Sequence, residues 1–169
     1  MTGQDFAKRA LIFGCGNILF GDDGFGPAVA KHLQEHYTLP EDVQVLDVGT
    51  SIREILFDLA LSDQKPQRII IIDAVDHPDR KPGEVFEIPV DAIPPKKTAD
   101  FSLHQFPTVN LLQELKEHTR VEIHIIVAQV QELPEEVRPG LSPAVAAAVK
   151  DAAAQIFDLL GFASWKKFC

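Results

Sequence analysis

Two adjacent acids, Asp22 and Asp23, stand in a loop that opens with Gly14 and Gly16 and places a further glycine on each side of the acidic pair. Glycine lets a backbone turn sharply and approach other groups closely, and a glycine-rich loop between a strand and a helix usually holds a phosphate. Two carboxylates would repel a phosphate. We therefore expect this loop to offer a carboxylate to a metal ion.

Two more acids stand where apolar runs end. Asp47 follows the run 43–46, and Asp73 follows the run 68–72, which reads RIIII. A charge placed directly after four isoleucines is costly unless it has a partner or a task, so Asp73 is a strong site candidate. Asp47 is equally compatible with a plain loop hydrogen bond. Asp22 has a structural alternative, because a helix N-terminus favours an acid.

Two histidines could complete such a site. His104 follows the proline- and lysine-rich stretch 91–102, which is expected to be an exposed loop, and His77 lies just past Asp73. Position along the chain does not choose between them. Carboxylates with a neutral imidazole form a nitrogen and oxygen site suited to a borderline divalent metal such as Zn or Ni.

The elements that must position these residues alternate between strand and helix. Helices are expected to begin near Pro27, Ser51, Pro107 and Ser142, with Ser51 and Glu54 forming a capping box. Short apolar runs, rich in β-branched residues, predict the strands 10–13, 43–46, 68–72, 85–88 and 121–130.

This order predicts an α/β fold, a three-layer α/β/α sandwich with a mainly parallel twisted sheet, similar to phosphorylases and hydrolases. Ligands of open parallel sheets bind outside the carboxyl ends of the strands. The loops that carry Asp23, Asp47 and Asp73 should therefore open on one edge, where the loop of His104 could fold over them.

Composition bounds the class of protein. The 169 residues fit one domain, 1–169. A net charge of -9 argues against a nucleic-acid surface. Two cysteines, Cys15 and Cys169, make no disulfide framework, so we expect a cytoplasmic protein. No apolar run is long enough to span a membrane.

Five motifs, taken together, resemble those of the hydrogenase maturation endopeptidases, over nearly the whole chain. The motifs occur in the order of that family, which is more specific than any one of them. They are G-x-G-N-x-L-x-x-D-[DE]-x-x-G at 14–26, D-x-G-T at 47–50, D-A at 73–74, S-x-H-Q at 102–105 and L-[ST]-P at 141–143.

The resemblance implies an endopeptidase that removes the C-terminal extension from the large-subunit precursor of a nickel–iron hydrogenase once nickel is installed. The three metal-contacting and catalytic residues of the family map onto Asp23, Asp73 and His104, which selects His104 over His77 and Asp23 over Asp22. Nickel arrives with the precursor, so the resting enzyme is expected to be metal-free or to hold an adventitious divalent ion. Residues 50–76 further resemble the branch that processes F420-reducing hydrogenases.

Several alternatives stay open at this stage. The bound metal could activate a water, or one carboxylate, Asp23 or Asp73, could act as general base. Many family members carry Glu where this chain has Asp23, whose arm is one methylene shorter. A non-catalytic nickel chaperone would use the same three residues, and a nucleotide-binding module would use the Gly14 loop with Asp47.

Overall fold

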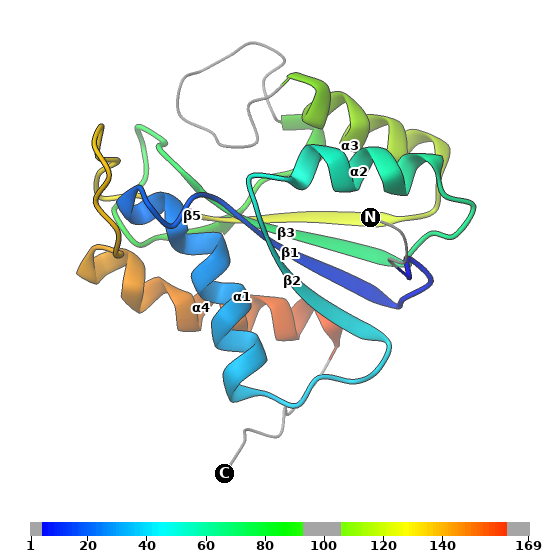
Figure 1. The fold of residues 1–169 in the computed structure, drawn as a ribbon, viewed down its shortest axis with the longest axis horizontal. Coiled ribbons are helices and arrows are strands. Elements are labelled where there is room, and N and C mark those ends of the chain that lie inside the picture. The colour runs from blue at the N-terminus through cyan, green and yellow to red at the C-terminus, as the bar shows by residue number, and fades with distance from the viewer. Residues whose placement is uncertain (1–4, 93–105, 162–169) are drawn as a thin grey trace.

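The computed structural model describes residues 5–92 and 106–161, and they form an α/β fold (Figure 1). Five strands make one sheet in the order β2-β1-β3-β5-β4. All neighbours are parallel except β4, which runs antiparallel to β5 at the edge. The strands are β1 (Ala10–Cys15), β2 (Val43–Gly49), β3 (Arg68–Val75), β4 (Val85–Glu87) and β5 (Glu122–Gln129).

The helices lie on both faces of the sheet. Helices α1 and α4 cover one face, and α2 and α3 cover the other (Figure 1). The predicted three-layer α/β/α architecture is therefore confirmed. The helices are α1 (Phe25–His36), α2 (Ile52–Leu61), α3 (Phe106–His118) and α4 (Pro143–Leu160), together with the short 3₁₀ helices η1 (Gly21–Gly24) and η2 (Val90–Ala92).

The central strands owe their position to continuous apolar sequence. Every residue of β1 is buried, and β3 is buried from Ile69 to Val75. Alternate side chains of β3 enter the two cores: Ile69 and Ile71 pack under α2 and α3, whereas Ile70 and Ile72 pack under α1 and α4. A strand covered on both faces needs apolar residues at every position, which is why RIIII marks the centre of the sheet.

Helix α4 runs the height of the sheet and is fastened at both ends. Its N-cap is Ser142, whose hydroxyl accepts a 3.5 Å hydrogen bond from the Val145 N–H, as the sequence predicts. At the other end, the guanidinium groups of Arg9 and Arg68 donate to the carbonyls of Leu160 and Leu159. These cations stabilise the carbonyl end of the helix dipole and hold it at the amino edge of the sheet.

One predicted helix start and one predicted capping interaction differ from the structure. Helix α1 begins at Phe25 rather than Pro27, because η1 continues directly into it. The predicted capping box at Ser51 is wrong, since its side chain makes no capping hydrogen bond. The backbone of Ser51, with φ -95° and ψ 15°, lies outside the extended region from which a capping side chain reaches back to the first turn.

None of the helices in the described part of the chain combines the length and apolar character needed to cross a membrane.

Candidate active site

The glycine-rich loop after β1 is held by very close backbone approaches. A Cβ atom on Gly26 would lie 2.2 Å from the Cys15 carbonyl oxygen and 2.5 Å from that of Ile72. A Cβ on Gly16, where φ is +134°, would lie 1.8 Å from the Asp23 carbonyl oxygen. The space that these glycines leave is therefore filled by the protein's own backbone. This packing counts against the phosphate-binding alternative and places the acidic turn at the carboxyl ends of β1 and β3.

Asp23 is the less buried residue of the acidic pair. Its side chain is half-buried, and its Oδ2 accepts one hydrogen bond, of 2.8 Å, from the backbone N–H of Asn17. Burial raises the pKa of Asp23, and the Asn17 N–H acts in the opposite direction. A partly desolvated carboxylate with one donor keeps lone pairs available for a metal ion or a proton.

Asp22 faces the other way and is saturated. It is 1% exposed. Its Oδ1 accepts from the Ser142 N–H at 2.7 Å, while its Oδ2 accepts from the Gln131 N–H and the Ser142 hydroxyl, both at 2.9 Å. Asp22 thus ties η1 to the chain that links β5 and α4. It is a structural acid, although its binding partners are more than a hundred residues away rather than in the adjoining helix.

Asp73 lies within β3, two residues before the end of the strand. It is fully buried, and its Oδ1 accepts a 2.8 Å hydrogen bond from the Ala74 N–H. The electrostatics of Cys15 indicate which acids lie near it: burial, and then the charges of Asp73, Asp47 and Asp23, raise the pKa of that thiol well above its ordinary value. The three acids therefore converge on the end of β1, as the rule for parallel sheets predicts.

Asp47 has a local role in this arrangement. It is exposed, and its Oδ1 accepts a 3.0 Å hydrogen bond from the Gly49 N–H at the carboxyl end of β2, where the register with β1 shifts. This end of β2 contributes a backbone carbonyl to the loop of the site, since the Gly49 oxygen accepts from the Gly16 N–H at 2.9 Å. Asp47 fixes the end of β2 and adds negative charge near Cys15.

The histidine of the predicted trio, His104, lies outside the described residues. Within residues 5–92 and 106–161, no three His, Cys, Asp or Glu side chains form a group that could hold a metal ion. His77, the alternative, is exposed; its ring Nδ1 accepts a 3.2 Å hydrogen bond from the Asp79 N–H, and the ring stands edge-on to Phe86. His77 is therefore engaged in its own loop.

One further residue, which was not predicted from the sequence, shapes this edge. Gln129, the last residue of β5, is buried; it accepts a 2.7 Å hydrogen bond from the His77 N–H and donates to the Asp76 carboxylate at 3.0 Å. It orders the loop that follows Asp73. A buried amide at the end of an apolar strand must satisfy its hydrogen bonds. The position of Gln129 directly after an apolar run is therefore the feature of the sequence that could have indicated its role.

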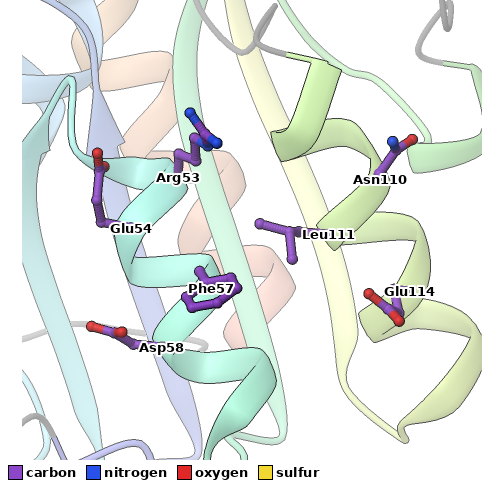
Figure 2. A pocket seen from close by; sticks show the side chains of 7 residues that line it. All are labelled: Arg53, Glu54, Phe57, Asp58, Asn110, Leu111 and Glu114. Atoms are coloured by element: carbon purple, nitrogen blue, oxygen red, sulfur yellow. The ribbon is translucent and has the colours of Figure 1, made fainter.

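A hollow of the described surface lies elsewhere, between α2 and α3 (Figure 2). Its volume is about 730 Å³. In Figure 2, Phe57 of α2 and Leu111 of α3 lie between the two helices. The lining combines one cation and three carboxylates with these apolar side chains: Arg53, Glu54, Phe57, Asp58, Asn110, Leu111 and Glu114. This hollow lies along the helix layer and does not include the acids at the end of β1.

Comparisons with known proteins agree on one family. A family model described as hydrogenase maturation protease matches residues 27–159. A Methanocaldococcus jannaschii protein assigned to the hydrogenase maturation proteases is 41% identical over 147 residues, which are 86% of this chain and 92% of that protein. The coenzyme F420 hydrogenase subunit delta of Methanothermobacter thermautotrophicus is 34% identical over 160 residues, with 92% and 97% covered.

A solved structure shares the same fold. The hydrogenase maturating endopeptidase from Escherichia coli superposes with a TM-score of 0.74 at 25% identity, covering 95% of this chain and 96% of that one.

Proposed function

The chain belongs to the hydrogenase maturation protease family and is a hydrolase, and from this premise we propose that it removes the C-terminal extension of a nickel–iron hydrogenase large-subunit precursor after nickel insertion. The observation that carries the proposal is the pair of acids at the carboxyl edge. Asp23 is half-buried with a raised pKa, Asp73 is fully buried, and both act electrostatically on Cys15.

We propose that Asp23, Asp73 and His104 contact the nickel that the precursor already holds, and that they also carry the catalysis. Oxygen and nitrogen ligands should not strip nickel from thiolates, so the ion remains with the substrate while these side chains contact it. Contact with the ion then distinguishes a precursor that has received nickel from one that has not. The ion orients the scissile peptide, and a water attacks the peptide carbonyl with help from the ion or from a carboxylate base.

The likeness to a coenzyme F420 hydrogenase subunit supports a finer proposal, that the precursor belongs to a hydrogenase of the F420-reducing kind. The chemistry of the site is the same for any precursor whose thiolates hold nickel. Identity of the precursor is therefore tested by offering several purified large subunits to the protein and measuring which one is shortened.

The deciding experiment is mass spectrometry of a purified large-subunit precursor incubated with this protein, with and without nickel. The nickel-loaded precursor should lose its extension, and the nickel-free precursor should stay intact. Cleavage of the nickel-free form at the same rate would overturn nickel recognition. No mass change with any nickel-loaded precursor, together with stable binding, would favour a nickel chaperone.

The assignment of residues is tested with paired variants. His104→Ala should abolish cleavage, whereas His77→Ala, which removes the competing histidine, should leave it intact. Asp23→Asn and Asp73→Asn should each abolish cleavage as well. Equal activity of the two histidine variants would remove His104 from the site.

A further inference from the structure

Four of the six large apolar side chains that stand exposed on the described surface gather on two loops beside the acidic turn. Ile18 and Leu19, which are 59% and 45% exposed, precede η1; Leu133 and Val137, which are 43% and 64% exposed, lie between β5 and α4. We call these four residues the apolar ridge. Exposed apolar residues scattered singly need no explanation, but a group of them marks a contact surface.

The two loops of the ridge are fastened together by backbone hydrogen bonds. Arg138 donates its N–H to the Leu19 carbonyl at 2.8 Å and accepts from the Gly21 N–H at 2.8 Å. Phe20 and Arg138 form a parallel β-bridge. Asp22 adds its bonds to Gln131 and Ser142. Because its backbone is held in this way, the ridge can bind a partner with little loss of loop entropy.

The ridge is continuous with the candidate active site. Asn17, which donates its N–H to Asp23, also accepts a 3.0 Å hydrogen bond from the Leu19 N–H on its side-chain oxygen. Ile18 and Leu19 therefore stand on the same short turn that holds the carboxylate. A protein whose peptide reaches Asp23 therefore comes close to this turn.

Charge around the ridge indicates the chemistry of its partner. Glu132, Glu135 and Glu136 are exposed on the same loop as Leu133 and Val137, and Arg138 pairs with Glu132. In the part of the chain that the structure describes, neither Glu135 nor Glu136 takes part in an ion pair. These two carboxylates form an acidic rim. A complementary surface is apolar at its centre and carries Lys or Arg beside it.

We propose that the apolar ridge and its acidic rim are the docking surface for the folded body of the large-subunit precursor, through an apolar patch flanked by basic side chains. A hollow of about 300 Å³ lies beside the ridge, and its lining includes Glu132 and Arg138 as well as Pro134. This inference rests on the proposed function. It adds a contact that sets affinity for the precursor and takes no part in the chemistry.

The test measures KM and kcat for cleavage of purified, nickel-loaded precursor. Leu19→Ser with Val137→Ser should raise KM about tenfold or more, as expected for central apolar contacts, and leave kcat within about twofold. The matched control is Phe57→Ser with Leu61→Ser, two apolar residues that are 53% and 70% exposed on α2, which should change neither constant. Urea unfolding of both double variants confirms that they fold.

The acidic rim is tested separately. Glu135→Lys with Glu136→Lys should raise KM, and added salt should reduce the difference from the wild type, because salt screens exposed charges. Glu114→Lys on α3 is the control. Failure of the wild type to cut would overturn the proposed function, whereas normal cutting with unchanged KM in the ridge and rim variants would overturn only the docking surface. Sedimentation that shows a dimer lost in Leu19→Ser with Val137→Ser would assign the ridge to self-association instead.

Discussion

Neutralising Asp22 and neutralising Asp23 should have opposite consequences, although the two residues are adjacent. The two carboxylate oxygens of Asp22 together accept three hydrogen bonds of 2.7 to 2.9 Å. In Asp22→Asn, an NH₂ group replaces one of these oxygens and faces buried donors, from which it cannot accept a hydrogen bond. A hydrogen bond to a charged group contributes about 1.5–3 kcal/mol, and an orphaned buried donor costs about 1–3 kcal/mol more. We expect Asp22→Asn to lower the free energy of unfolding by about 3–5 kcal/mol.

The charge of Asp23 has the opposite effect on the free energy of unfolding: it destabilises the folded protein. Its pKa is raised in the folded protein, so the folded state binds the proton more tightly than the unfolded state does. Ionised Asp23 therefore costs stability above its folded pKa, and this cost is absent below its unfolded pKa. Asn at this position removes the cost but weakens the bond from Asn17. We expect Asp23→Asn to unfold within about 1 kcal/mol of the wild type and to lose cleavage.

The assay is urea unfolding at pH 7, combined with precursor cleavage without urea. With a slope near 2 kcal/mol per molar, a loss of about 3–5 kcal/mol moves the midpoint of Asp22→Asn down by about 1.5–2.5 M, while the folded fraction still cuts. Asp23→Asn keeps the wild-type midpoint and does not cut. If both variants had the same midpoint, or if Asp22→Asn alone lost cleavage while fully folded, our division of roles would be refuted.

Three further outcomes are expected from the same geometry. As pH falls, kcat/KM for the precursor should decline because Asp23 must be ionised to act. The midpoint of this decline should lie above the ordinary aspartate pKa of 3.8; a midpoint at or below that value would contradict the role of Asp23. Gly26→Ala should lower the free energy of unfolding by about 1–3 kcal/mol or more, since its Cβ would meet the backbone of Cys15 and Ile72; an unchanged urea midpoint would mean that α1 shifts freely. Cys15, buried with a raised thiol pKa, should be alkylated only as the protein unfolds, as peptide mass spectrometry would measure; rapid labelling in the native protein would contradict its burial.

Much of the fold follows from local sequence patterns. The run RIIII identifies β3 as central because a strand covered on both faces leaves no polar position. Pro89, two residues after the end of β4, agrees with an edge strand, and β4 does lie at the edge. Convergence of Asp23, Asp47 and Asp73 also follows from topology, since all carboxyl ends of parallel strands share one edge.

The roles within the acidic pair could not be derived in the same way. Asp22 and Asp23 differ by one step along the chain, and what separates them is the segment from Gln131 to Ser142 that folds back onto Asp22. That contact is made across more than a hundred residues, so no local pattern reports it. Only the family resemblance selected Asp23. The same reason hid Gln129, whose partners lie in the loop after β3.

The fastening of α4 has a practical consequence for experiments with large partners. Arg9 and Arg68 hold the end of α4 at the amino edge of the sheet, and β1 also starts there, at Ala10. The described chain therefore enters and leaves on the side opposite the acids. A surface anchor attached to a side chain at this amino edge would leave the acidic turn facing free solution, where an incoming subunit could approach it.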